Sequence, residues 1–345
     1  METAADGVLV KVEGLSCVFG SGESLTRVLC DVDLTVGRSR TLGLVGESGS
    51  GKSMLMKSIL GIAPRSARID GKVTFGGTDL STLGEGERRR FLGRHVGIVF
   101  QNSATSLNPF VRVGRQIEEA SRYHFGLSKA QGKKLSIELM GAVGLPDPAE
   151  CYQQYPHQFS GGMKQRIMIA TALACKPDLL IADEATTALD VTVQKQVLDL
   201  LQSLQQERQM SMILVTHNLG IVAGRTDEAA VMYGGRIVER GPTEALFRDP
   251  RHRYTAALLE AIPRADQPAH TRLQSIPGRP PDVLRPIPGC PFAPRCAAVE
   301  AQCSERMPPV ATTADERHGF ACYAPVGRET SKAPAAASGV RIGGR

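Results

Sequence analysis

Short apolar runs, each followed by polar or glycine-rich residues, recur along the first two thirds of the chain. They lie at residues 41–45, 96–100, 179–182 and 212–216, and helical stretches are predicted among them, for example 54–60 and 163–175. Apolar runs of this length are typical of strands that are buried on both faces of a parallel sheet. The alternation of such strands with helices predicts an α/β fold.

The composition of the chain changes near Asp249. Fourteen of the 21 prolines and four of the eight cysteines lie between residue 250 and the C-terminus. We therefore predict a large N-terminal domain at 1–248, followed by a Pro/Cys-rich C-terminal extension at 249–323. The Ala, Gly, Ser and Pro content of the last segment, 324–345, predicts a disordered tail.

Charge and hydropathy limit where the protein can work. The net charge is +6, and 11 Lys and Arg against 7 Asp and Glu lie from Arg264 onward. A solvated basic surface and a nucleic-acid-binding patch are both compatible with this excess. The sequence contains no run of about 18 apolar residues that could span a bilayer, and its N-terminus lacks a signal-peptide layout. A cytoplasmic protein is expected.

A phosphate-binding motif follows the first apolar run. Gly46-Glu-Ser-Gly-Ser-Gly-Lys52-Ser53 matches G-x-x-x-x-G-K-[ST] between a predicted strand and a predicted helix. Glycines let backbone N–H groups point at phosphate oxygens, Lys52 is expected to neutralise the β- and γ-phosphates, and the Ser53 hydroxyl is expected to bind Mg²⁺. The residues predicted to contact nucleotide here are Ser48, Gly49, Ser50, Gly51, Lys52, Ser53 and Met54.

Two acidic residues, Asp183 and Glu184, end the apolar run that begins at residue 179. The carboxyl ends of parallel strands face the ligand crevice of such a sheet. Asp183 is placed to hold the hydration shell of Mg²⁺, and Glu184 is the candidate base that polarises the attacking water. Two solvated acids at a strand end would be the simpler interpretation, but it fits poorly beside a phosphate loop.

The octapeptide Phe159-Ser-Gly-Gly-Met-Lys-Gln-Arg166 precedes the predicted helix at 163–175. A serine hydroxyl, two glycine backbones and a helix N-terminus make an anion site. Together with Ala182-Asp183-Glu184, this run resembles the ATP-binding cassette (ABC) ATPases. The resemblance implies a RecA-like core with an antiparallel β subdomain and a helical subdomain at about 102–165. It also implies a head-to-tail dimer in which four residues clamp the ATP of the other subunit: Ser160, Gly161, Gly162 and Gln165.

The same resemblance implies roles for single residues that spacing alone does not distinguish. Gln101 stands where ABC proteins carry a glutamine that contacts Mg²⁺ and the attacking water, and His217 where they carry a histidine that contacts the γ-phosphate. Phe19 is the candidate for stacking on adenine, with a place in the apolar core as the alternative. Residues 188–190 match the loop that crosses to the opposite ATP site. The implied Mg²⁺ ligands are Ser53, Gln101 and Asp183.

Three departures from the ABC pattern are small. Phe159 stands where leucine is usual, Ala185 replaces a common proline, and Asn218 follows the histidine where aspartate is frequent. None of these changes removes a group that contacts phosphate or water. A catalytically active site is therefore expected, although Ala185 leaves the turn that aims Glu184 less constrained.

One branch of the ABC ATPases fits best. The run Asn102–Phe110 and the Gly46-Glu47-Ser48 start of the phosphate loop resemble the dipeptide/oligopeptide importer ATPases (OppD/DppD type), and so do the extension segments 252–259, 275–282 and 289–296. The resemblance covers about residues 8–323.

This resemblance implies a subunit that powers peptide import by ATP-driven dimer closure, bound peripherally at the cytoplasmic face of the membrane. The implied partners are a second homologous ATPase subunit, two transmembrane permease subunits and, indirectly, an extracytoplasmic solute-binding protein, with no nucleic acid. The rival is a soluble nucleic-acid- or ribosome-associated ABC ATPase. The sequence disfavours the rival, because it has one cassette and no Trp for base stacking.

Four cysteines lie in the extension, with five, six and eighteen residues between successive members: Cys290, Cys296, Cys303 and Cys322. None forms the closely spaced pair that is usual in zinc sites. Four thiolates suit a [4Fe–4S] cluster, and members of the resembled family carry this pattern. Zinc binding, free thiols and disulfides remain alternatives. The other four cysteines are predicted to be small buried residues: Cys17, Cys30, Cys151 and Cys175.

Overall fold

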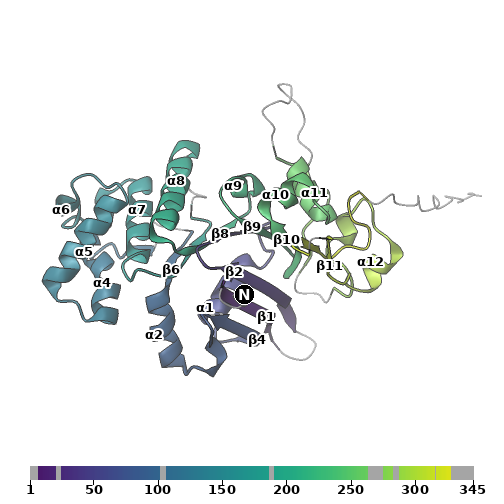
Figure 1. The fold of residues 1–345 in the computed structure, drawn as a ribbon, viewed down its shortest axis with the longest axis horizontal. Coiled ribbons are helices and arrows are strands. Elements are labelled where there is room, and N and C mark those ends of the chain that lie inside the picture. The colour runs from purple at the N-terminus through teal and green to yellow at the C-terminus, as the bar shows by residue number, and fades with distance from the viewer. Residues whose placement is uncertain are drawn as a thin grey trace, which may run out of the picture.

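The computed structural model of the chain describes residues 7–20, 25–101, 106–185, 190–262, 275–282, 287–314 and 316–327. A helical subdomain lies at one end of the molecule and the C-terminal extension at the other, with two sheets between them (Figure 1). In the described part of the chain, no helix is both long and apolar enough to cross a bilayer.

An eight-stranded sheet with the order β11-β12-β10-β9-β3-β8-β7-β6 forms the core. The strands β6, β7, β8, β3 and β9 pair in parallel, and the others pair in antiparallel fashion. All four predicted strands belong to this parallel part, which confirms the α/β class. The strands are β3 (Thr41–Val45), β6 (Val96–Val99), β7 (Leu179–Asp183), β8 (Ser211–Thr216), β9 (Glu228–Tyr233), β10 (Arg236–Pro242), β11 (Ala311–Thr312) and β12 (Gly319–Phe320).

Both faces of this sheet are covered, which explains why its strands are continuously apolar. In β7, Leu179 and Ile181 pack into one apolar cluster, whereas Leu180 and Ala182 pack into another on the opposite face. All four side chains are fully buried. Successive side chains of a strand point to opposite faces, so only a run without polar positions satisfies both clusters.

A second, antiparallel sheet has the order β2-β1-β4-β5. Its strands are β1 (Val8–Phe19), β2 (Thr26–Gly37), β4 (Ala67–Phe75) and β5 (Thr78–Asp79). It shares an apolar cluster with α1 (Lys52–Leu60) and α2 (Glu85–His95), through residues such as Val10, Leu34 and Leu55. The antiparallel subdomain thereby packs against the helix that follows the phosphate loop.

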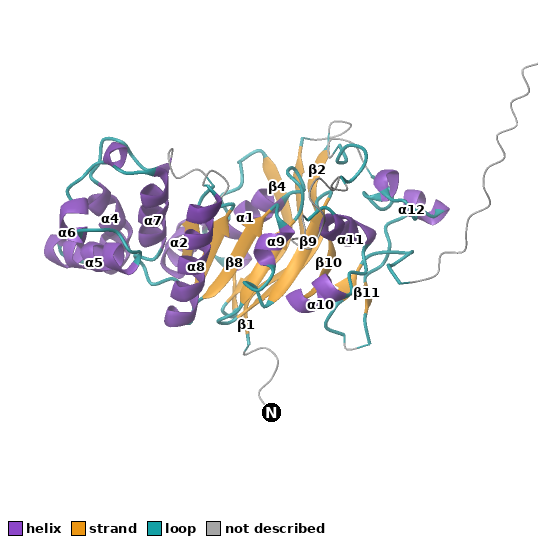
Figure 2. Ribbon diagram, turned by 90° about the horizontal axis from the view of Figure 1, so that it is seen from above, coloured by secondary structure: helices purple, strands orange, loops and turns teal. Residues whose placement is uncertain are grey.

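The helical subdomain gathers at one end of the molecule in both ribbon views (Figures 1 and 2). Its elements are α4 (Val113–Phe125), α5 (Lys129–Ala142), α6 (Pro148–Cys151), η3 (Pro156–Gln158) and α7 (Gly161–Ala172). Ile117, Met140 and Ile167 join them in one buried cluster that continues to α8 (Val191–Arg208). The described elements agree with the predicted subdomain, whose bounds at 102 and 165 remain a prediction. Short helices complete the described part of the first domain: η2 (Leu80–Thr82), α9 (Leu219–Val222) and α10 (Thr243–Arg248).

The extension packs against the core sheet. Its elements are α11 (Arg253–Glu260), η4 (Ala293–Arg295), α12 (Ala301–Glu305) and the strands β11 and β12. Phe292 of the extension lies in one apolar cluster with Tyr233 and Tyr254, and β12 pairs with β10. Residues on both sides of the predicted boundary at 248/249 therefore pack together, and the boundary itself stays a prediction.

The segment predicted to be disordered, 324–345, begins with bonded residues. Ala324 is buried, its carbonyl accepts from Arg253 Nε at 2.8 Å, and Val326 N donates to Arg251 O at 2.9 Å. Residues 328–345 lie outside the described residues.

Candidate active site

The phosphate loop connects β3 to α1, and its glycines are required by close contacts. A Cβ on Gly46 would lie 2.2 Å from Met232 O, and Gly51 has φ 105° as the N-cap of α1. Gly49, with φ 80°, faces open space. Such positive φ values favour glycine, so the sequence folds here into a loop whose outer side is accessible to phosphates.

Lys52 is held inside this loop. Its side chain is 4% exposed, and Nζ donates to Gly46 O at 2.7 Å and to Glu47 O at 3.0 Å. Burial lowers the pKa of the ammonium, and the carboxylates of Glu184 and Asp183 oppose this shift. A phosphate bound in the loop would replace the two carbonyls as the partner of Lys52.

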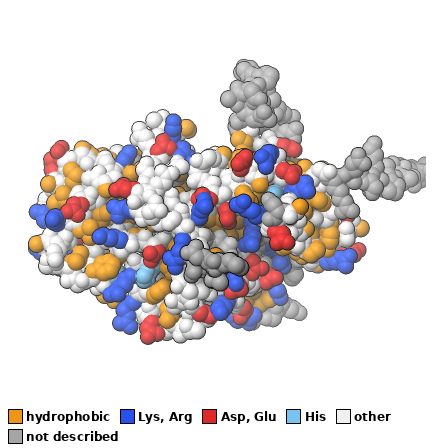
Figure 3. Space-filling view, viewed as in Figure 1, with side chains coloured by type: hydrophobic (Ala, Val, Ile, Leu, Met, Phe, Trp, Pro, Cys, Tyr) orange, Lys and Arg blue, Asp and Glu red, His pale blue; other side chains and the backbone are white. Residues whose placement is uncertain are grey.

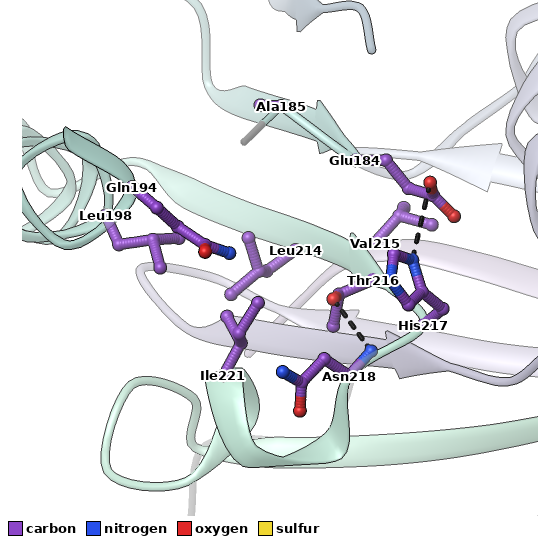
Figure 4. A pocket seen from close by; sticks show the side chains of 10 residues that line it. All are labelled: Glu184, Ala185, Gln194, Leu198, Leu214, Val215, Thr216, His217, Asn218 and Ile221. Carbon is purple, nitrogen blue, oxygen red and sulfur yellow. Dashed lines mark hydrogen bonds and ion pairs between the residues drawn. The ribbon is translucent and has the colours of Figure 1, made fainter. Parts of the chain in front are cut away.

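Glu184 is the point where four chain segments meet. Gln101 Nε2 donates to Glu184 Oε2 at 2.9 Å, His217 Nδ1 lies 3.5 Å from the same oxygen, and Lys52 Nζ lies 3.9 Å from Oε1. The His217 contact is drawn in Figure 4. Gln101, Glu184 and His217 follow β6, β7 and β8, so the sheet brings together the three residues predicted to be catalytic.

The backbone of Glu184 is left-handed, with φ 47°. A non-glycine residue in this region costs about 1–3 kcal/mol and is found preferentially at functional sites. Its N–H donates to Val215 O at 3.0 Å, and the following Ala185 is 4% exposed. The bond to β8 and the burial of Ala185 hold this turn although the usual proline is absent.

A Mg²⁺ site is compatible with the neighbouring side chains. Ser53 Oγ donates to Asp183 Oδ1 at 3.4 Å, and the bond from Gln101 Nε2 holds the Gln101 amide beside Glu184, the residue after Asp183. Burial raises the pKa of Asp183; the hydrogen bond from Ser53 opposes this, and the charge of Glu184 adds to it. Hydroxyl, amide and carboxylate oxygens are the ligand types that Mg²⁺ accepts.

The predicted clamp lies on α7, apart from α1 in both ribbon views (Figures 1 and 2). Ser160 is the N-cap of α7 and its Oγ accepts from Met163 N at 3.4 Å. A Cβ on Gly162 would lie 2.8 Å from Val193 Cγ1 of α8, so this glycine allows the two helices to approach. Gln165, by contrast, is 1% exposed, and in the described residues its Nε2 has no partner. Its predicted contact with ATP would require this side chain to move.

Other predicted nucleotide contacts are only partly visible. Phe19 is the last residue of β1 and is half-buried against the apolar cluster of that sheet. This position is compatible both with stacking on adenine and with a place in the apolar core. Ser50 is buried and Met54 is half-buried. In the predicted crossing loop, Asp190 caps α8 by accepting from Val193 N at 3.0 Å, whereas residues 188 and 189 lie outside the described residues.

A cavity of about 140 Å³ opens beside Glu184 and His217 (Figure 4). Gln194 and Leu198 of α8 and Ile221 of α9 close its far side. The cavity borders the candidate catalytic residues Glu184 and His217 and belongs to the same site.

The four cysteines of the extension line one small pocket of about 10 Å³, together with His252 and Phe292. Burial raises the pKa of Cys290 to about 11 and also raises the pKa values of Cys296 and Cys322. Among the described residues, no group of three or more His, Cys, Asp or Glu is arranged to hold a metal ion. Of the remaining cysteines, Cys30 is half-buried and three are buried, as predicted: Cys17, Cys151 and Cys175.

Sequence reasoning missed the role of Arg295 beside the phosphate loop. Arg295 of the extension makes a bidentate ion pair with Glu47, at 2.7 and 3.1 Å. The available signal was the acidic residue itself, because a carboxylate inside a phosphate-binding loop requires a cationic partner.

Comparison with known proteins gives matches over most of the chain. The ABC transporter family matches residues 29–187, and the oligopeptide/dipeptide transporter C-terminal region matches residues 238–303. A putative peptide import ATP-binding protein of Brucella abortus (strain 2308) is 45% identical over 306 residues, covering 88% of this chain and 92% of the relative. The oligopeptide transport ATP-binding protein OppD of Salmonella typhimurium is 43% identical over 319 residues, covering 92% and 94%.

Solved structures share the fold. CbiO1 of Clostridium perfringens, part of the ABC transporter complex CbiONQ, aligns with TM-score 0.60 and 25% identity over 70% of this chain and 91% of that chain. The ATP-binding cassette MJ0796, in a post-hydrolysis dimer bound to ADP and Pi, aligns with TM-score 0.61 and 24% identity over 68% and 99%. These alignments confirm the predicted class of nucleotide-binding fold.

Proposed function

This chain belongs to the ATP-binding subunits of ABC peptide importers and is an ATPase that powers peptide import, and we propose that Glu184 is the base of its hydrolytic step. The observation that supports this role is the convergence on Glu184 of Gln101, His217 and Lys52. A carboxylate at this place can accept a proton from water that attacks a phosphate held by Lys52. The three neighbours orient the carboxylate and balance its charge.

Substitution of Glu184 in the assembled importer tests this role. Glu184→Gln keeps the size and the hydrogen bond from Gln101 but cannot take up a proton, so ATP turnover should fall at least about a hundredfold while nucleotide still binds. Glu207→Gln, at an exposed position of α8, is the matched control. Wild-type turnover in Glu184→Gln would refute the assignment.

We propose that each ATP is completed by a second subunit. The helix α7, which begins at the Ser160 cap, lies apart from α1 of the same chain in both ribbon views, which supports a clamp acting on ATP bound elsewhere. ATP then joins two ATPase subunits, and hydrolysis releases them. The remaining proposed partners are two permease subunits and, through them, an extracytoplasmic solute-binding protein. The proposed location is peripheral, on the cytoplasmic face of the membrane.

The nucleic-acid-binding alternative gains no support from the relatives, whose names describe peptide import and transport. On the face shown in Figure 3, basic and acidic side chains are interspersed over the described surface. Electrostatic binding to nucleic acid uses a continuous basic patch. Salt-sensitive retention of the protein on DNA or RNA would restore this alternative.

We propose that the four cysteines of the extension bind a [4Fe–4S] cluster. The donor set fits such a group, because all four thiols line one pocket. The space between them is about 10 Å³, roughly that of one water molecule, so the side chains must separate to admit the cluster. When bound, the cluster would link four distant points of a segment rich in proline.

Metal analysis of protein prepared without oxygen tests this proposal. About four irons and four acid-labile sulfides per chain, lost in Cys296→Ser but kept in Cys175→Ser, are expected. One zinc per chain would show a zinc site instead, and protein without metal would show that the thiols are free.

A further inference from the structure

The phosphate loop carries an acidic residue close to the place where a triphosphate would bind. Glu47 directly follows Gly46, and its backbone carbonyl accepts from Lys52 Nζ at 3.0 Å. Its side chain is 24% exposed. An unpaired carboxylate here would repel the phosphates of a nucleotide, so the way this charge is balanced matters for ATP affinity.

Arg295 pairs with the carboxylate of Glu47 and is itself held by further hydrogen bonds. Its Nη1 donates to Glu47 Oε2 at 2.7 Å and to Tyr233 OH at 3.0 Å, and its Nη2 donates to Glu47 Oε1 at 3.1 Å and to Ile276 O at 3.2 Å. The fifth donor, Nε, reaches Pro277 O at 2.7 Å. All five N–H groups of the guanidinium are thereby used, and the side chain is 5% exposed. A lysine cannot reproduce this fork.

A second contact from the extension fixes the backbone of the same loop residue. Tyr254 of α11 accepts a hydrogen bond from Glu47 N at 2.9 Å. The rings of Tyr254 and Tyr233 lie 4.3 Å apart and pack against Phe292. Both the side chain and the amide of Glu47 are therefore set by residues that lie in, or pack against, the extension.

Arg295 also stands between two of the clustered cysteines. It lies in the short helix η4, where Ala293 N donates to Cys290 O at 3.0 Å and Cys296 N donates to Ala293 O at 3.2 Å. The turn that presents the guanidinium to the phosphate loop is thus the turn that connects Cys290 to Cys296. The same short backbone segment therefore determines both the position of Arg295 and the positions of Cys290 and Cys296.

We propose that Arg295 is a positioning residue for ATP binding: it neutralises Glu47 and holds this carboxylate against the extension, so that the affinity of the phosphate loop depends on the folded extension. The inference rests on the proposed binding of ATP at Lys52. The extension then influences nucleotide affinity through one pair of side chains, Arg295 and Glu47, which lie 248 residues apart in the chain.

The test compares four forms of the full chain in the assembled importer: wild type, Arg295→Gln, Glu47→Gln and the double variant. Arg295→Gln exposes the Glu47 charge and should raise the KM for ATP about tenfold, with kcat changed less than about twofold. The double variant, which lacks both charges, should return the KM for ATP to within about threefold of wild type. Arg306→Gln, an exposed arginine at the end of α12, is the matched control.

The rescue separates positioning from a purely structural role. If Arg295 only stabilises the extension, the double variant will be at least as impaired as Arg295→Gln, and that result would overturn the proposal. An unchanged KM in a folded Arg295→Gln would overturn it as well. If Arg295→Gln does not assemble into the importer, Arg295→Lys takes its place. We expect Arg295→Lys to raise the KM for ATP about threefold, and we expect Glu47→Gln to remove this increase. An increase in KM that persists in the Glu47→Gln background would again overturn the proposal. Wild-type importer without ATP turnover would instead refute the proposed function.

Discussion

Gln101 Nε2 donates to Glu184 Oε2 at 2.9 Å, although 83 residues separate the two side chains in the sequence. They follow β6 and β7, which are neighbours in the parallel sheet. The bond uses the amide nitrogen of Gln101 and leaves its oxygen as the group suited to Mg²⁺. The proposed Mg²⁺ ligand Gln101 and the candidate base Glu184 are therefore coupled through one amide.

This coupling predicts the effect of truncating the glutamine. In Gln101→Ala, the carboxylate of Glu184 loses its orienting donor, so kcat for ATP should fall about tenfold to a hundredfold while equilibrium ATP affinity changes much less. Single-turnover hydrolysis and nucleotide titration of the assembled importer measure the two quantities. Gln206→Ala, on the exposed face of α8, serves as control. A loss of affinity with normal single-turnover hydrolysis would contradict the coupling.

A buried carboxylate should anchor the extension. Glu239 of β10 is 1% exposed; its Oε1 accepts from His318 Nε2 and Arg251 N, each at 2.6 Å, and its Oε2 accepts from His252 N at 2.9 Å. Glu239→Gln replaces one carboxylate oxygen by an NH₂ group, which then faces N–H groups that need an acceptor. We expect a loss of about 3 kcal/mol in the free energy of unfolding. Urea denaturation measures it, with Glu244→Gln at an exposed position as control. Equal stability of the two variants would speak against the anchor.

Stability should fall with mild acid because of His252. Burial lowers the pKa of this imidazole to about 4, although the Glu239 carboxylate opposes the shift. An unfolded histidine titrates near pH 6.5, so between about pH 6.5 and 4 the unfolded chain binds a proton that the folded chain does not. This contribution is intact above pH 6.5 and decreases as the pH falls, by about 2 kcal/mol between pH 7 and 5.

Urea midpoints at several pH values test this dependence. Nδ1 of His252 accepts from Tyr254 N at 3.1 Å, a helix-capping bond that an asparagine oxygen can keep without titrating. His252→Asn should therefore show a shallower decline between pH 7 and 5 than the wild type. Parallel declines would assign the acid sensitivity to other groups.

The close contact between α7 and α8 predicts that Gly162→Ala impairs ATP-dependent closure and that a second substitution, Val193→Ala, restores it. Gly162→Ala would place a Cβ 2.8 Å from Val193 Cγ1, so the start of α7 or the Val193 side chain must shift. We expect ATP-dependent closure of the importer, measured as ATP retained by the Glu184→Gln background, to weaken about tenfold. Val193→Ala removes the clash and should restore retention in the double variant. Failure of this restoration would show that Gly162 matters for another reason, such as its backbone contact with phosphate.

The sequence was sufficient for the parts of the site that obey local rules. The phosphate loop, the acids after β7 and the cap of α7 each follow from a few consecutive residues, because backbone geometry and helix ends determine where such groups point. Gln101 and His217 required the family resemblance, since one polar residue after a strand carries little information. The structure brings both to Glu184.

Other features depend on contacts between distant segments and had no local signal. The pairing of Arg295 with Glu47 joins positions 248 residues apart, and the left-handed backbone of Glu184 comes from its bond to β8. Likewise, Gln165 lies inside the helical core because of how α7 packs, which its neighbours in the sequence do not specify. Tertiary packing decides such positions.

The pairing of β12 with β10 has a consequence for solubility. Glu239 and Arg240 of β10 lie opposite Phe320 and Gly319, and the two-residue strand β11 follows outside them with both residues exposed. A long open strand edge offers unpaired N–H and C=O groups to other molecules, whereas a very short one does not. The extension thus closes the core sheet at this side, and a chain cut before residue 319 would present the edge of β10 as a template for aggregation.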